Sequence, residues 1–146
     1  MMKTLSHTLL VSLLFLAAPS FAEIQKFGDV DVNYNVITTD TLSPQMAKAY
    51  GITRSNRRGL LTVAVSKPNE LGLPKPVAAS VKASTVNMIE QHRDIKIRSI
   101  HEGTAIYYIG EFAFATPDFL RFTLSIAEKA GGKPFKIEFQ KNYDNP

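Results

Sequence analysis

The densest group of side chains that could bind a charged ligand is basic. It consists of Lys48, Arg54, Arg57 and Arg58, which lie at the end of a predicted helix and in the polar turn after it. Because a guanidinium group binds a carboxylate or phosphate through two parallel hydrogen bonds, this group could dock an acidic partner or anionic lipid headgroups. Cations near a helix C-terminus also have a purely structural explanation. We therefore treat the four residues as a candidate binding patch.

A second pattern resembles a calcium-binding loop. Every second residue from Asp29 to Asn35 is an aspartate or asparagine, and Asp40 follows at the twelfth position. Such a loop needs glycine at its sixth position for a sharp turn, but that position holds Tyr34. The polar face of a strand explains the pattern better, because alternate side chains of a strand point the same way.

Zinc and other metals also lack a recognisable ligand set. Beyond residue 22, the histidines are His92 and His101, and the chain has no cysteine and no His-Glu-x-x-His motif. Only carboxylates brought together by folding, such as Glu90, Glu102 or Glu111, could complete a site. We therefore expect no metal site and no cofactor.

Covalent and hydrolytic catalysis have no visible motif either. No serine lies in a Gly-x-Ser-x-Gly turn, and without cysteine there is no thiolate nucleophile. Paired carboxylates for glycoside hydrolysis could be recognised only in three dimensions. The sequence therefore predicts that the protein is not an enzyme.

The first residues predict export. Lys3 precedes an apolar stretch over Leu9–Ala18, and the small residues Ser20 and Ala22 suit a cleavage site, so residues 1–22 are expected to be a signal peptide. The apolar core is shorter than the ~20 residues that a membrane-spanning helix needs, so no stable membrane anchor is expected. We expect one domain over residues 23–146, in the periplasm or, alternatively, secreted.

The amino-acid composition limits the classes of partner that we expect. The formal net charge of +4 over 146 residues is modest, so we expect no nucleic-acid partner. Because there is no cysteine, stability outside the cytoplasm must come from packing and not from disulfides.

Alternation of apolar and polar residues predicts strands along most of the chain. Asp29–Val36 is typical of a strand with one wet face, and a hairpin is expected around Gly131 and Gly132. A further turn at Glu102-Gly103 precedes the aromatic stretch Thr104–Phe114. Its residues Tyr107, Tyr108, Phe112 and Phe114 could form a ligand platform, but a central strand buried on both faces is the simpler interpretation.

One short helix interrupts the strands. Ser43 can cap a helix that begins at Pro44, and Gly51 suits its end. Met46, Ala49 and Tyr50 are expected on one side, where they could cap the end of a sheet. The proline-containing segment Lys67–Pro76 is expected to be an irregular surface loop.

These elements indicate a mainly β protein. We expect a two-sheet, immunoglobulin-like sandwich of seven or eight antiparallel strands with one short helix. A small β-barrel is the alternative.

Several segments resemble a known family of small exported proteins of Gram-negative bacteria. The most specific is the helix-plus-arginine segment with Ala47-Lys48, Tyr50-Gly51-Ile52 and Arg54-Ser55, followed by Gly59-Leu60-Leu61 and, later, by Ile106–Phe112 and Phe139-Gln140-Lys141. The family is the domain of unknown function 4426, and the resemblance extends from Phe27 to Tyr143. It implies an exported, single-domain β protein. Because the family has no established activity, the resemblance assigns no catalytic or binding residue.

The leading hypothesis for function is a non-enzymatic periplasmic domain that binds another envelope protein through an edge strand or the basic turn. The alternative is a small-ligand binder or carrier with a cavity between the sheets or near the helix. An enzyme with an unrecognised site is the third hypothesis.

Overall fold

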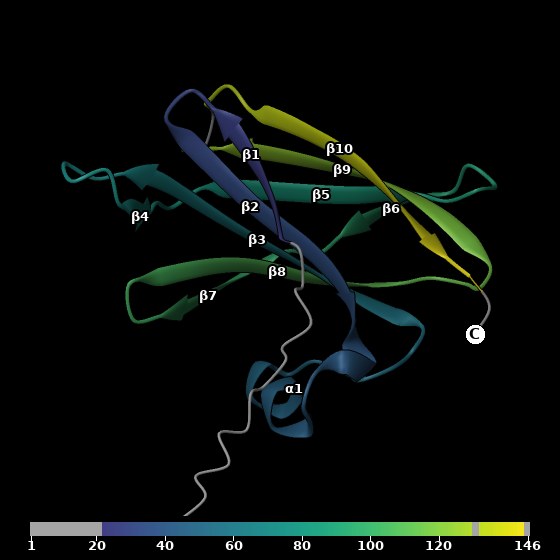
Figure 1. Ribbon diagram of the computed structural model, residues 1–146. Coiled ribbons are helices and arrows are strands. Elements are labelled where there is room, and N and C mark those ends of the chain that lie inside the picture. The colour runs from purple at the N-terminus through teal and green to yellow at the C-terminus, as the bar shows by residue number, and fades with distance from the viewer. Residues whose placement is uncertain (1–21, 130–131, 145–146) are drawn as a thin grey trace, which may run out of the picture.

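The described strands form two antiparallel sheets (Figure 1). The computed structural model describes residues 22–129 and 132–144, so the predicted signal peptide lies outside the described residues except for Ala22. The six-stranded sheet, called sheet A, has the order β1 (Glu23–Phe27), β2 (Val30–Thr38), β3 (Arg58–Pro68), β8 (Ala105–Ala113) and β7 (Arg98–Glu102), with β4 (Pro74–Pro76) also paired to β3. The four-stranded sheet B has the order β10 (Phe135–Tyr143), β9 (Asp118–Ala127), β5 (Ser80–Val86) and β6 (His92–Ile95).

The predicted fold class is confirmed: the described residues form a β-sandwich with one α-helix, and their strands do not close into a barrel. The number of strands is higher than the seven or eight expected. Part of the difference lies in the segment Lys67–Pro76, where the predicted irregular surface loop is present only over residues 69–73. There β3 continues to Pro68 and pairs with the short β4, with Pro68 opposite Pro74. Proline is tolerated at such a sheet edge because the missing N–H would face solvent.

The main core lies between the two sheets. Alternate residues of β2 point inward, and Val30, Val32, Tyr34 and Val36 are buried as the alternation predicts. Sheet B contributes Phe122, which is 1% exposed and stacks on Phe139 with ring centroids 4.7 Å apart. Phe112 of sheet A meets the edge of Phe122 at 5.1 Å. Interlocking rings of this kind fill the space between the sheets.

The helix α1 (Pro44–Tyr50) follows a 3-10 turn, η1 (Thr39–Thr41), and lies below sheet A in Figure 1, away from sheet B. Its ends are as predicted: Ser43 Oγ accepts the Met46 N–H at 3.1 Å, and Gly51 adopts the left-handed conformation with φ 65°. Ala47 is the buried residue of the helix, and it packs with Ile52, Leu60 and Ile109 on the outer face of sheet A. The helix therefore covers a face of the sheet, and the prediction that it caps the end of a sheet was wrong.

Two predicted hairpins are present. β9 and β10 pair from Phe135 opposite Ile126 to Tyr143 opposite Asp118. Gly131 of their connection lies outside the described residues, so the glycine turn proposed there stays a prediction. β7 and β8 are joined at Gly103, whose φ of 59° suits glycine. Among the described residues, no helix is long and apolar enough to cross a membrane.

Candidate functional site

The outer face of sheet A carries an apolar pocket beside α1. Its volume is about 270 Å³. Its lining comes from β2, β3, β7, β8, α1 and the segments on either side of the helix: Ile37, Leu42, Met46, Tyr50, Ile52, Leu60, Thr62, Ile100, Glu102, Tyr107 and Ile109. Most of these side chains are apolar, so water in this hollow gains little from contact with its walls.

Local sequence explains how the helix side of the pocket forms. Met46 and Tyr50 lie four positions apart, so both project from the same side of α1 and both line the pocket. Ala47 between them is 3% exposed and makes the close contact with the sheet. Because α1 has only seven residues, it covers Leu60 and Ile109 but leaves part of the apolar face open.

The sheet side of the pocket follows from register. Thr62 of β3 lies opposite Ile109 of β8, and Ile100 of β7 lies opposite Tyr107. Successive side chains of a strand point to opposite faces, so Tyr107 and Ile109 face the pocket while Tyr108 points into the main core. The Tyr107 side chain is 36% exposed, and Met46 on the helix is 48% exposed.

Glu102 is the charged residue in the pocket lining. It lies at the end of β7, where it is exposed, and its side chain makes no hydrogen bond or ion pair with another residue in the described part of the chain. The pocket therefore combines an apolar wall with one free carboxylate at its rim.

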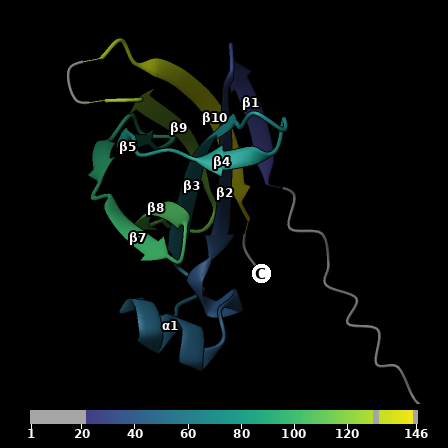
Figure 2. The same cartoon turned by 90° about the vertical axis from the view of Figure 1, so that its left-hand side faces the viewer.

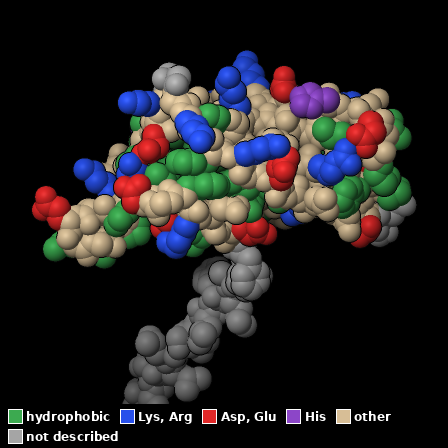
Figure 3. Space-filling view, turned by 90° about the horizontal axis from the view of Figure 1, so that it is seen from above, with side chains coloured by type: hydrophobic (Ala, Val, Ile, Leu, Met, Phe, Trp, Pro, Cys, Tyr) green, Lys and Arg blue, Asp and Glu red, His purple; other side chains and the backbone are tan. Residues whose placement is uncertain are grey.

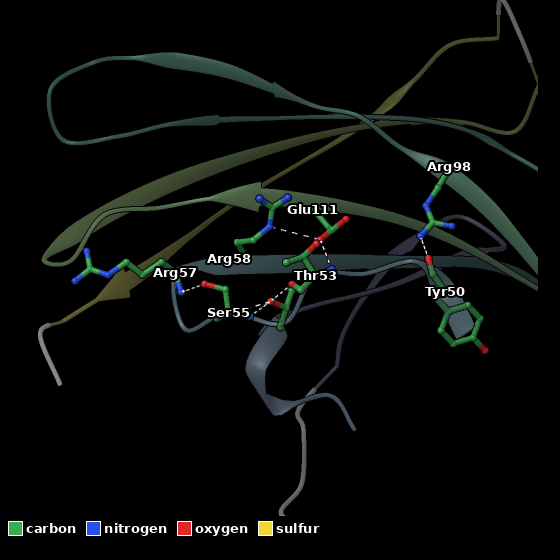
Figure 4. Close-up of polar contacts among 8 residues, drawn as sticks. Tyr50, Thr53, Ser55, Arg57, Arg58, Arg98 and Glu111 are labelled. Carbon is green, nitrogen blue, oxygen red and sulfur yellow. Dashed lines mark hydrogen bonds and ion pairs between the residues drawn. The ribbon is translucent and has the colours of Figure 1, made fainter. Parts of the chain in front are cut away.

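Polar contacts from distant parts of the chain hold the helix and its flanking segments in place (Figure 4). An Arg98 side-chain N–H donates to the Tyr50 carbonyl at the end of α1. The Thr53 N–H donates to Glu111 Oε1 at 3.3 Å, and Thr39, fully buried, donates to the Thr53 carbonyl at 2.8 Å and accepts the Ser55 N–H at 2.9 Å. Hydrogen bonds of this kind fix the position of the helix that walls the pocket.

The predicted basic patch is divided by these contacts. Arg54 donates to the Asp40 carbonyl at 2.9 Å, and Arg58 Nε lies 3.6 Å from Glu111 Oε1. Figure 4 shows Arg58 turned toward Glu111, whereas Arg57 points away from it. Lys48 and Arg57 are exposed. Two of the four cations thus contribute to the local structure, and docking by the patch stays a prediction.

Charges elsewhere on the surface are mixed. On the face shown in Figure 3, Lys and Arg side chains are interspersed with Asp and Glu. Defined pairs include Lys26 with Asp31 at 2.9 Å and Arg121 with Glu90 at 2.8 Å. This distribution gives that face no broad single-sign field to attract a polyanion.

Sequence reasoning missed the pocket mainly at Tyr107. The aromatic stretch was expected to be buried on both faces, which holds for Tyr108, Phe112 and Phe114. It was wrong for Tyr107, because that residue lies on the outer face at a place that α1 does not reach. The β7–β8 turn was predicted, but no signal in the sequence revealed where the helix would lie against the sheet.

The residues considered for metals lie apart. Among residues 22–129 and 132–144, no group of three or more His, Asp or Glu side chains could hold a metal ion. His92 Nε2 is 3.2 Å from Asp94 on β6, and His101 lies on β7. Asp31 and Asn33 occupy the outer face of β2, as expected for a strand.

Solved structures share this fold. A crystal structure of a DUF4426 family protein from Pseudomonas aeruginosa PAO1 has a TM-score of 0.71 and 29% identity, and the match covers 86% of this chain and 96% of that chain. FetP of uropathogenic Escherichia coli strain F11, expressed in the E. coli periplasm, has a TM-score of 0.57 and 10% identity over 84% of this chain and 93% of that chain. A copper-bound FetP variant gives the same TM-score and identity, over 84% and 94%. At this identity, the two FetP structures show the fold alone.

No curated protein matches the sequence. The model of a family described as a domain of unknown function, DUF4426, matches residues 24–143. That range includes α1, the pocket and nearly the whole of both sheets. The resemblance noted from the helix-plus-arginine segment is therefore confirmed, and the chain belongs to the DUF4426 family.

Proposed function

We propose that the protein is a non-enzymatic binding protein of the periplasm, and that the pocket beside α1 holds apolar side chains of another envelope protein. The observation that carries this proposal is the contrast between a filled main core and an open apolar hollow on the outer face of sheet A. Met46 and Tyr107 expose large apolar surface there. Exposed apolar surface in a concave site is typical of a contact for a partner.

The size of the pocket favours side chains over a larger ligand. Sites for drug-sized molecules and cofactors usually measure roughly 300–1,000 Å³. The volume here, about 270 Å³, falls just below that range. One or two apolar side chains of a partner would fill it, and such anchors supply most of the binding energy in many interfaces.

The lining supports binding more than catalysis. General acid–base chemistry uses groups held within hydrogen-bond reach of one another. Glu102 is an isolated carboxylate, and the other polar groups of the lining are the hydroxyls of Tyr50, Thr62 and Tyr107. A small-ligand binder is the second candidate, favoured by the way the helix walls one side of the hollow.

The periplasmic assignment rests on the predicted signal peptide, with its expected cleavage after Ala22. The FetP proteins of similar fold include one expressed in the periplasm. Intact-mass measurement on the periplasmic fraction tests this assignment. A product that begins at Glu23 is expected, and one that retains Met1 would contradict export.

Site-specific photo-crosslinking tests the pocket itself. A benzoylphenylalanine placed at position 46 is expected to form an adduct with a specific envelope protein when the cells are irradiated. Position 88 is the matched control, because Met88 is 57% exposed but lies outside the pocket. The same adducts from both positions, or none from position 46, would contradict the proposal. A small molecule seen in native mass spectra, without any protein adduct, would instead favour the second candidate.

A further inference from the structure

We propose that the partner binds as an extended strand along the free edge of β7, with Lys or Arg opposite Glu102 and a long apolar residue opposite Ile100. This inference rests on the proposed function, because it names the chemistry of the segment that the pocket receives. It adds three features that the pocket alone does not define. These are backbone hydrogen bonds to β7, a positive charge on the partner, and the spacing between the partner's basic and apolar residues.

The edge is available. β7 is the last strand in the order of sheet A, and in the described residues no strand pairs with its far side. Figure 2 shows it as the outermost strand above α1. Hydrogen-bonded and non-hydrogen-bonded pairs alternate along an antiparallel ladder, so every second residue of β7 directs its N–H and C=O to the free side. An unpaired row of such groups is a template for an added strand.

The other edges are less suitable. Along β10, Lys136 pairs with Glu138 at 2.8 Å, and Lys141 donates to the Val36 carbonyl of β2 at 2.8 Å, so its side chain reaches across to sheet A. β6 has only four residues, three of them exposed and polar or charged. β6 also contributes no residue to the apolar pocket, whereas β7 contributes Ile100 and Glu102. β1 contributes no residue to the apolar pocket.

The pocket gives β7 its specificity. Ile100 and Glu102 are two positions apart, so both project from the outer face, and both line the pocket. On an added strand, the residues opposite them would lie on the same face, with Cβ atoms roughly 4.5–5.5 Å away. A long side chain opposite Ile100 would reach over it toward Tyr107, into the open part of the hollow.

Charge complementarity identifies the partner residue that lies opposite Glu102. Glu102 is the charged residue of the lining and has no ion-pair partner in the described structure. Opposite charges directly across two strands attract, and like charges repel. A Lys or Arg of the partner would therefore lie opposite Glu102. Antiparallel pairs outnumber parallel ones, and in that direction the basic residue precedes the apolar residue by two positions.

A synthetic peptide tests this inference directly. The probe is fluorescein-labelled Ser-Thr-Lys-Thr-Phe-Thr-Ser, and its binding to the purified protein is followed by fluorescence anisotropy. Replacing the peptide lysine by glutamate is expected to weaken binding about two- to fivefold, the size expected for a partly exposed charge pair. Glu102→Lys is expected to reverse this preference. Glu70→Lys, which changes an exposed carboxylate outside the pocket, is the control and is expected to leave it unchanged.

Backbone methylation separates strand addition from simple insertion of a side chain. Methylating the peptide nitrogens of one alternate set of residues is expected to abolish binding, while methylating the other set leaves it intact, because only one set faces β7. Equal effects of the two sets, or unchanged charge preference in Glu102→Lys, would overturn the inference. If the probe does not bind although crosslinking at position 46 succeeds, strand addition is wrong and the proposed function stands. If both fail, both are wrong.

Discussion

The two faces of sheet A differ in their residues, since Asp31 and Asn33 of β2 lie on the outer face, and they also differ in their cover. The inner face is covered by a four-stranded sheet, and Val32, Leu61 and Val63 are completely buried there. The outer face is covered by a helix of seven residues, which buries Leu60 and Ile109 but leaves Tyr107 exposed. Where the outer face is apolar, beside α1, the length of the covering element decides which side chains are packed and which line an open pocket.

The largest effect is expected from emptying the inner core. Phe122→Ala removes a fully buried ring that contacts Phe139 and Phe112, and should lower the free energy of unfolding by about 3–5 kcal/mol. Urea denaturation followed by circular dichroism measures it. Met46→Ala, on the open outer side, is the matched variant and should lose less than about 1 kcal/mol. Equal losses would mean that the two faces are packed alike.

A smaller loss of stability, which comes from a residue of the inner face, is expected at alkaline pH. Burial, together with the hydrogen bond to Glu23 at 2.5 Å, raises the pKa of Tyr34 to about 12. Because its pKa in the unfolded chain is about 10, the folded state holds this proton more tightly. The stabilisation is therefore complete below pH 10 and is lost as the pH rises from 10 toward 12, by on the order of 2 kcal/mol.

Tyr34→Phe checks this assignment, since phenylalanine has no proton to lose. Its free energy of unfolding should fall less than that of the wild type between pH 9 and 12. Parallel pH curves for the two proteins would show that another group is responsible.

On the outer face, removing the N-cap of α1 should lower the free energy of unfolding by about 1 kcal/mol. Ser43→Ala leaves the Met46 N–H without its side-chain acceptor. Hydrogen exchange should accelerate at Ile52, whose N–H donates to the Ala47 carbonyl at 2.8 Å, and should stay unchanged in β9. Ser43→Asp, which can also cap a helix, should restore protection. Faster exchange throughout both sheets would show that the outer layer is not independent.

Features that depend on neighbouring residues can be predicted from this sequence, whereas features that depend on long-range contacts cannot. The inward residues Val30 to Val36 and the helix limits Ser43 and Gly51 follow from period-two alternation and from capping, which involve neighbouring residues. The position of the helix depends on contacts such as Arg98 to Tyr50 and Thr53 to Glu111, which join residues 48 and 58 positions apart. No periodicity reports such pairs, so the pocket that they create could not be predicted.

The smallest changes in the free energy of unfolding are expected at Arg57 and Arg58. These two residues are neighbours in the sequence but should respond differently to substitution. Arg57 is exposed and points away from Glu111, so Arg57→Glu should change the free energy of unfolding by less than about 0.5 kcal/mol. Arg58→Glu puts a second carboxylate beside Glu111 and should lose up to about 1 kcal/mol, because this ion pair is only partly exposed. Combining Arg58→Glu with Glu111→Arg should recover most of that loss. If Arg58→Glu is as neutral as Arg57→Glu, the pair does not stabilise the fold, and Arg58 is again free to join Lys48 and Arg57 in the predicted docking patch.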